Sequence, residues 1–280
     1  MTVGEPMKMS IAELKEQARV LRRDIITCTT IAGSGHPSSS LSGVEIMAAL
    51  YFGGVMRYDP AEPHWAKRDR LIMSKGHASP LLYVVLAHAG YFSTDLLETL
   101  RQIGSPLEGH PNMSRLPGVE ASTGSLGQGL SIGLGHAFAA RIDNADNHVF
   151  VILGDGEQDE GQIWEAAMTA AHYDLDNVTA IVDHNKAQQT GWVRDVLDYS
   201  PLTEKWRAFQ WDVQEIDGHD MEAVLEALQR AKATQGRPSC IVAHTVKGKG
   251  VSFVEADYAY HGKALTKEEE QRALEELGWQ

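Results

Sequence analysis

Two apolar stretches decide the fold: VFVILGDGE at residues 149–157 and VTAIVDHNKA at residues 178–187. Each is a short run of branched and aromatic residues that ends in small or polar ones, which is typical of a buried parallel strand followed by a loop. The segment between them, 161–173, has helical periodicity. A strand, a helix and a second parallel strand place the two terminal loops side by side.

The same alternation continues along the chain and predicts an α/β fold with a doubly wound, mainly parallel sheet flanked by helices. Strands are expected at 70–74, 148–153, 178–183, 212–216 and 240–245. Helices are expected at 10–31, 44–52, 126–140, 161–173, 221–233 and 267–277, with one more after Pro80. Because no repeat or linker interrupts the pattern, we expect a single domain over residues 1–280.

Composition excludes several classes of protein. Hydrophobic residues make up 43% of the 280 residues, enough to bury a sizeable core. The chain has 38 acidic and 25 basic residues and a net charge of −13, so a nucleic-acid binder is not expected. A membrane span needs roughly 20 continuous apolar residues, which no stretch offers, and no signal peptide is evident. Cys28 and Cys240 are too few and too far apart for a disulfide framework, which suits a cytoplasmic location.

Polar residues after the two deciding strands form a candidate cation site. Asp155 lies between two glycines directly after the first strand, and Asn185 follows the second. The Asp155 carboxylate, the Asn185 amide and the Ala187 carbonyl offer three oxygens to Mg²⁺, which leaves room for two phosphate oxygens and a water. A tight turn is the alternative for Gly-Asp-Gly alone, and the second loop at this spacing favours the metal site.

GDG at 154–156 with HN at 184–185 resembles the signature of thiamine-diphosphate enzymes, in which NN follows GDG at similar spacing. His184 departs from the Asn or Asp that is common at its position, whereas Asn185 matches. Over nearly the whole chain, six motifs in order resemble the N-terminal, diphosphate-binding domain of transketolases. They are SGHP at 34–37, SKGHA at 74–78, EGHP at 108–111, TGSLGQGL at 123–130, HTVKGKG at 244–250 and HGK at 261–263.

This resemblance implies the cofactors thiamine diphosphate and Mg²⁺, or another divalent cation such as Ca²⁺ or Mn²⁺. The implied cofactor-binding residues are His77, Gly124, Leu126, Asp155, Gly156, Asn185 and His261. The implied metal ligands are Asp155, Asn185 and Ala187. The implied catalytic residues are His36, His110 and His261. Among these, His110 binds the C1 hydroxyl of the donor, and His36 with His261 deprotonates its C3 hydroxyl, a task that suits imidazoles near neutral pH.

The sequence indicates less about the roles of Lys247 and of the histidines outside the motifs. Lys247 follows the last strand and is expected either to reach a phosphate or close a lid, or to be a solvated lysine. The histidines outside the motifs are interpreted as structural or solvated: His64, His88, His136, His148, His172 and His219.

The implied activity is transfer of a two-carbon ketol unit from a ketose, or ketose phosphate, to an aldose. In transketolases the glutamate that activates the cofactor lies in a second, pyrimidine-binding domain, and this sequence ends at Gln280 without one. We therefore expect one subunit of a split transketolase, inactive alone, that joins a C-terminal partner subunit in an α₂β₂ assembly. Its exposed interface is expected to include the helix start at TGSLGQG, 123–129, and the 161–173 helix, where Ile163, Trp164, Ala167 and Met168 supply apolar surface. Copies of the chain are expected to self-associate through these helices, in addition to a tight contact with the partner subunit.

Three alternatives remain open at this point. The chain could belong to a deoxyxylulose-phosphate-synthase-like enzyme or a 2-oxoacid-dehydrogenase-like α subunit, which share GDG. It could also be a non-catalytic binding or regulatory subunit that keeps the fold. The SGHP, SKGHA and EGHP motifs favour transketolase over the first two, and intact Asp155 and Asn185 argue against the third. The sugars themselves are not indicated.

Overall fold

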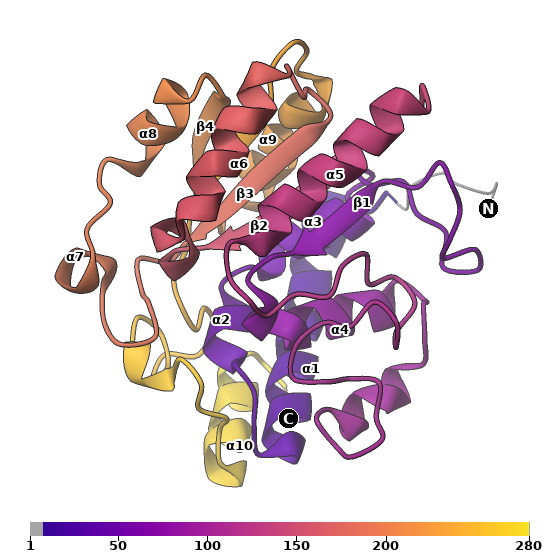
Figure 1. Cartoon of the computed structure of the whole chain (residues 1–280). Coiled ribbons are helices and arrows are strands. Elements are labelled where there is room, and N and C mark those ends of the chain that lie inside the picture. The colour runs from indigo at the N-terminus through magenta and orange to yellow at the C-terminus, as the bar shows by residue number, and fades with distance from the viewer. Residues whose placement is uncertain (1–7, 280) are drawn as a thin grey trace.

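The computed structural model describes residues 8–279 and builds them around one sheet of parallel strands in the order β1-β2-β3-β5-β4. The strands are β1 (Arg70–Met73), β2 (Val149–Gly154), β3 (Val178–His184), β4 (Asp212–Asp217) and β5 (Ser239–His244). Each expected strand is present with its ends within one residue of the prediction. The predicted doubly wound, parallel sheet is confirmed (Figure 1).

The two deciding stretches lie side by side at the centre of this sheet. Every residue of β2 is buried, and β3 is buried up to Asp183. Because both faces of such strands are covered by helices, β2 is apolar throughout and β3 is mainly apolar up to Val182, rather than alternating. Gly154 pairs with Asp183, so the loops that follow β2 and β3 leave the sheet next to each other.

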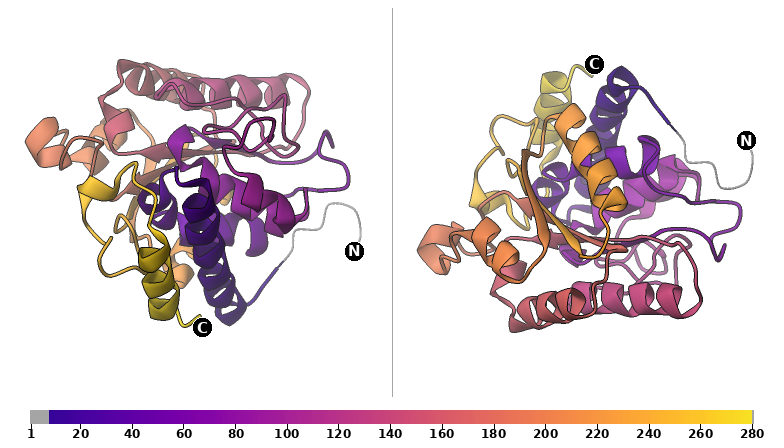
Figure 2. Two further views of the ribbon diagram at one scale, coloured as in Figure 1. Left: turned by 90° about the horizontal axis from the view of Figure 1, so that it is seen from below. Right: turned by 90° about the horizontal axis from the view of Figure 1, so that it is seen from above.

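Helices cover both faces of the sheet (Figure 2). One face is covered by α5 (Gln128–Ile142), α6 (Gly161–His172) and α8 (Leu202–Ala208). The other is covered by α1 (Ile11–Ala32), α3 (Val44–Phe52), α4 (Ser79–His88) and α9 (Met221–Ala233). The remaining α-helices are α2 (Pro37–Leu41), α7 (Val193–Val196) and α10 (Lys267–Glu276). Short 3₁₀ turns occur at Gly76–Ala78, Thr94–Thr99, Gly156–Asp159 and Tyr258–Tyr260.

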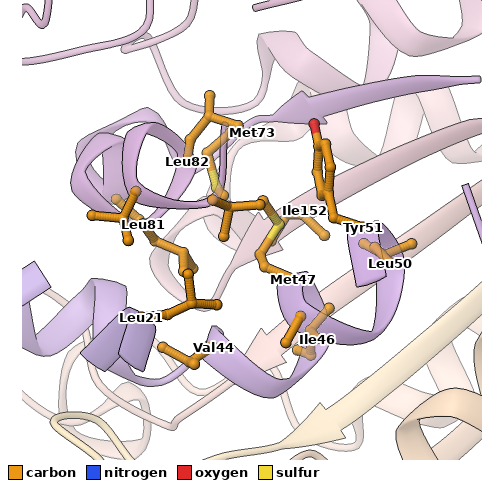
Figure 3. Packing of buried hydrophobic residues seen from close by; sticks show 14 of the residues in the cluster. Leu21, Val44, Ile46, Met47, Leu50, Tyr51, Met73, Leu81, Leu82 and Ile152 are labelled. Carbon is orange, nitrogen blue, oxygen red and sulfur yellow. The ribbon is translucent and has the colours of Figure 1, made fainter. Parts of the chain in front are cut away.

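The larger part of the core lies where α1, α3 and α4 meet the sheet. Helix α3 is buried along its whole length and is apolar nearly all round, as expected of a core helix. Figure 3 shows Met47 of this helix among Leu21, Leu81 and Ile152, which come from α1, α4 and β2. Sequence-distant helices are therefore held together by one continuous apolar cluster.

Glycine sets where α5 begins. The sequence predicted a start at residue 126, but the helix begins at Gln128, because Gly127 has a left-handed φ of 83° that helical residues do not adopt. One residue into the helix, a Cβ on Gly129 would lie 2.3 Å from Oγ of Ser74. Glycine at this position therefore lets α5 approach the loop after β1. Among residues 8–279, no helix is both long enough and apolar enough to cross a bilayer.

The expectation for the exposed face of α6 is mostly wrong. Ile163 and Ala167 are fully buried against the sheet, and the Trp164 ring stacks on Phe209 at a centroid distance of 5.6 Å. Only Met168 is exposed, at 52%. The apolar stripe of an amphipathic helix faces the chain's own core, so Ile163, Trp164 and Ala167 do not supply a free surface.

Candidate functional site

The loops at the carboxyl ends of the strands surround a cavity of about 470 Å³. Ligand sites in open α/β sheets are found at this edge. Every residue that the sequence assigned to the cofactor, the metal or catalysis lines the cavity: His36, His77, His110, Gly124, Leu126, Asp155, Gly156, Asn185, Ala187 and His261. The fold thus gathers side chains from most of the length of the chain. None of the six histidines interpreted as structural or solvated lies in its lining.

Asp155 is the carboxylate at the centre of the candidate cation site, and it is only 3% exposed. Its Oδ1 accepts hydrogen bonds from Nδ1 of His184, at 2.5 Å, and from the hydroxyl of Tyr199. Its Oδ2 accepts the backbone N–H of Lys186 at 2.6 Å. Burial, together with the charge of Asp155, raises the pKa of Tyr199, so this hydroxyl stays protonated and acts as the donor.

The donor set around Asp155 fits a hard divalent cation. Asn185 is buried beside it and lines the same cavity as Ala187, whose N–H donates to Oδ1 of Asn185 at 3.2 Å. Within residues 8–279 no three His, Cys, Asp or Glu side chains form a metal cluster. A cation here would therefore rely on one carboxylate, an amide and a carbonyl, and would need further oxygens from a ligand, as Mg²⁺ commonly does with phosphates.

Three imidazoles in the lining of the cavity form a cluster. The ring centroids of His36 and His77 are 5.2 Å apart, those of His36 and His261 5.4 Å, and those of His77 and His261 5.1 Å. Burial lowers the pKa of His36 to about 4, with Arg101 adding to the effect. Burial and Lys247 lower the pKa of His261 to about 3, and burial also lowers that of His77. All three rings are neutral at pH 7, so each has one nitrogen able to accept a proton.

The fourth histidine of the motifs lies against the glycine loop. A Cβ on Gly124, where φ is 150°, would lie 3.2 Å from the ring of His110. Glycine is required there both by the backbone conformation and by the closeness of this ring. Burial, with Arg101 nearby, lowers the pKa of His110, so it too is neutral at pH 7.

A buried ion pair lies next to the cavity, which Lys75 lines. The ammonium of Lys75 contacts Oδ2 of Asp183 and donates to the carbonyl of Ser39 at 2.9 Å. Hydroxyls of Ser42 and Thr245 also donate to Asp183. Lys75 stood in a motif without an assigned role. Its position directly after β1 was the sequence signal that could have placed it at the site.

Lys247 is a second buried lysine on the cavity wall, so the interpretation as a solvated side chain is wrong. It is 1% exposed, and its ammonium donates to Oγ of Ser39 at 2.8 Å. Burial and the charge of Lys75 lower the pKa of Lys247 to about 7. A buried ammonium held by a hydroxyl rather than a carboxylate is suited to an incoming anion.

Sequence reasoning also missed Glu157, which joins two cofactor loops. Its buried carboxylate accepts the N–H of Gly127 at 2.9 Å, the N–H of Gly154 at 3.0 Å and the hydroxyl of Ser74. Burial raises the pKa of Glu157 despite these donors. A second cavity of about 690 Å³ adjoins the first and shares Asn185 and Lys247 with it, but it lacks the histidine cluster.

Fold and site together define a class: an α/β protein with a site for an anionic, diphosphate-type cofactor at the carboxyl edge of its sheet. Residues 11–280 match the family described as transketolase, thiamine diphosphate binding domain. The chain therefore belongs to the transketolase family, and thiamine diphosphate is the cofactor that this domain binds.

Similar proteins include both single subunits of transketolases and full-length transketolases. A 6-deoxy-6-sulfo-D-fructose transketolase subunit of Clostridium sp. (strain MSTE9) is 46% identical over 95% of this chain and 96% of that relative. An apulose-4-phosphate transketolase subunit of Phocaeicola vulgatus is 40% identical over 96% of this chain and 95% of that relative. The transketolase of Campylobacter jejuni has a TM-score of 0.91 and 35% identity, with 97% of this chain and 43% of that chain covered.

Human transketolase shows the same difference in length, being 40% identical over 98% of this chain but only 43% of its own. The chain thus spans less than half of the full-length enzymes and nearly all of the subunit-type relatives. These matches confirm the resemblance to the N-terminal subunit of a split transketolase and favour it over the other thiamine enzymes.

Proposed function

We propose that this chain is the diphosphate-binding subunit of a two-chain transketolase. The complex transfers a two-carbon ketol unit from a ketose, or ketose phosphate, to an aldose. The observation that carries the proposal is the cavity in which the candidate cation ligands, the glycine loop and the histidine cluster meet. It is supported by relatives that match end to end and are named transketolase subunits.

The role of the chain toward its cofactor is to hold and orient it. Asp155, Asn185 and the Ala187 carbonyl hold Mg²⁺, with Ca²⁺ or Mn²⁺ as substitutes, and Gly156 and Lys247 bind the diphosphate. The remaining cofactor contacts are assigned to His77, Gly124, Leu126 and His261. When bound, thiamine diphosphate supplies the nucleophilic carbon and the electron sink for carbon–carbon bond cleavage.

Proton transfer is assigned to the imidazoles. The donor's C3 hydroxyl must lose a proton as the C2–C3 bond breaks, and a neutral ring is the acceptor this requires. His36 and His261 are kept neutral by burial, and Nδ1 of each is buried without a hydrogen-bond partner among the described residues. His110, across the glycine loop, binds the C1 hydroxyl of the donor.

A second polypeptide completes the site. The subunit-type relatives match this chain end to end, whereas it covers only 43% of full-length transketolases, and this supports assigning the pyrimidine-binding domain and its activating glutamate to a partner subunit. We place the two chains in an α₂β₂ assembly, with residues 1–280 as a single domain of each α subunit. Cys28 and Cys240 are buried free thiols, which is consistent with a cytoplasmic location.

The donor is assigned to ketoses with an anionic terminus. The relatives' names specify a sulfonated fructose in one case and a sugar phosphate in another. Both substrates share a negatively charged group at a chain end. This shared chemistry defines the substrate class without choosing between sulfonate and phosphate.

The test compares the chain alone with the chain plus the product of the neighbouring reading frame. Isothermal titration should give weak thiamine diphosphate binding to the isolated chain and tight, Mg²⁺-dependent binding to the pair. A coupled assay should detect ketol transfer only with both polypeptides, and light scattering should give the mass of two copies of each. Full activity of the isolated chain would contradict the proposal, and cofactor binding without transfer in the pair would favour a non-catalytic subunit.

A further inference from the structure

The carboxylate of Asp155 is held by two side chains that the proposed function leaves without a role. The hydroxyl of Tyr199 and Nδ1 of His184 both donate to Oδ1, the latter at 2.5 Å. Tyr199 is 5% exposed and Asp155 3%, so the hydrogen bond between them is shielded from water, and the side chain of His184 is 14% exposed. Hydrogen bonds to a charged acceptor in such surroundings are stronger than neutral ones.

These donors distinguish the two oxygens of Asp155. A carboxylate oxygen has two lone-pair directions, and Oδ1 uses both on side-chain donors. The other oxygen, Oδ2, accepts only the N–H of Lys186, at 2.6 Å, among the residues that the structure describes. One direction at Oδ2 therefore remains for a cation. The network orients the carboxylate so that Oδ2 alone can bind a cation, and it prevents the rotation that would present both oxygens to the cation.

The same hydrogen bonds also hold the segment 185–199, which carries the other two proposed ligands. Asn185 and Ala187 lie at the start of this segment, where the N–H of Lys186 reaches Asp155, and Tyr199 lies at its far end. Both ends are therefore attached to one carboxylate. The segment that carries Asn185 and Ala187 is thus tied to Asp155, the third proposed ligand.

We propose that His184 and Tyr199 are positioning residues that fix Asp155 as a one-oxygen ligand and so favour Mg²⁺ over the larger Ca²⁺. The inference rests on the cation site of the proposed function. Mg²⁺ demands near-octahedral geometry with ligands at about 2.0–2.1 Å, whereas Ca²⁺ accepts bidentate carboxylates at about 2.3–2.6 Å and variable geometry. A carboxylate that is free to rotate loses the geometry that Mg²⁺ requires and retains what Ca²⁺ accepts.

The experiment measures how thermal unfolding of the full chain, with thiamine diphosphate present, responds to Mg²⁺ and separately to Ca²⁺. A ligand that binds only the folded state raises its stability by an amount that reports Kd, even for a weak site. In Tyr199→Phe and His184→Leu the Kd for Mg²⁺ should rise about 10- to 100-fold, as for other residues that support a metal ligand. The Kd for Ca²⁺ should rise less, so the ratio of the two changes.

Matched variants separate positioning from a general loss of stability. His184→Asn should restore the Mg²⁺ affinity that His184→Leu loses, because its amide N–H replaces the Nδ1–H donor. The comparison of these two variants carries the test if Tyr199→Phe does not fold. Tyr58→Phe removes a buried hydroxyl that has no partner among the described residues, and His64→Leu removes an exposed imidazole. Both controls should keep the Mg²⁺ to Ca²⁺ ratio of the unmodified chain.

The outcomes are distinct. A change of the ratio in Tyr199→Phe or His184→Leu, reversed in His184→Asn, supports the inference. Unchanged ratios in folded variants overturn it, provided that Asp155→Ala abolishes the response to Mg²⁺. If Asp155→Ala keeps the response to Mg²⁺, or if the unmodified chain responds to neither ion both alone and with its partner subunit, the cation site of the proposed function is wrong, and the inference is wrong with it.

Discussion

Replacing Asp183 with asparagine perturbs the ion pair that supports the cofactor cavity. Asp183 is fully buried, and its partner Lys75 is 1% exposed. Burial alone would raise the pKa of Asp183, but the ammonium of Lys75 and the hydroxyls of Ser42 and Thr245 hold it below its ordinary value. Asparagine has nearly the same size, so the substitution removes the charge without opening a cavity.

The expected loss is set by the uncompensated charge of Lys75. Removing one partner of a buried ion pair costs about 3–5 kcal/mol of unfolding free energy. For a chain of this size, about 1 kcal/mol lowers the Tm by about 2–4 °C, which gives an expected decrease of about 6–20 °C. Urea unfolding followed by circular dichroism would measure the free energy, and a thermal scan would measure the Tm.

Two control variants isolate the cost of the unpaired lysine. Glu204→Gln removes an exposed pair with Arg207 and should cost no more than about 1 kcal/mol. The double variant Lys75→Met with Asp183→Leu removes both charges and should be more stable than Asp183→Asn. A loss below about 1 kcal/mol for Asp183→Asn would refute the reasoning, because it would mean that the buried lysine does not need its partner.

Four further outcomes are expected. Asp155→Ala should abolish Mg²⁺-dependent cofactor binding in calorimetry of the two-subunit complex, because this carboxylate is the only formal charge among the proposed protein ligands; wild-type affinity would contradict the assignment. His110→Ala and His261→Ala should lose turnover about 10²- to 10⁴-fold but keep the cofactor, which in His261→Ala is still held by its other proposed contacts; near-normal rates would return both to a structural role. Because burial lowers the pKa of His36 to about 4 while the unfolded value is about 6.5, protons bind the unfolded state first. The free energy of unfolding should therefore keep its full value above about pH 6.5 and decrease as the pH falls toward 4, and this decrease should be less steep in His36→Gln. Burial lowers the pKa of Lys247 to about 7, so calorimetry in two buffers at about pH 8 should detect proton uptake on binding thiamine diphosphate, and Lys247→Gln should remove it.

The positions of the strands and of the motif loops followed from the sequence. Runs such as 149–153 and 178–182 are mainly apolar because both faces of a central parallel strand are covered, and that requirement applies residue by residue. Glycines and histidines stood at the ends of these runs, where a parallel sheet gathers its loops. The residues proposed for the site, from His36 to His261, consequently line one cavity.

The same local patterns did not indicate which part of the molecule each buried side chain packs against. The 161–173 segment was predicted to be a helix with apolar residues at an interface, yet the sequence did not show whether those residues face a partner or the sheet. Ile163 and Ala167 face the sheet. Lys247 was expected in solvent as readily as at a phosphate, but it contacts Ser39, 208 residues away along the chain.

What the sequence determined by itself is local: the alternation of strands and helices, the glycine-rich loops between them and the residue types those loops carry. Only the tertiary structure decided the pairings that set charge and geometry, such as Lys75 with Asp183 across 108 residues and Tyr199 with Asp155 across 44. The physical reason is that periodicity reports whether a residue is covered, whereas the partner of a buried charge depends on strand order. Here β5 is inserted between β3 and β4, and no local pattern in the chain specifies that order.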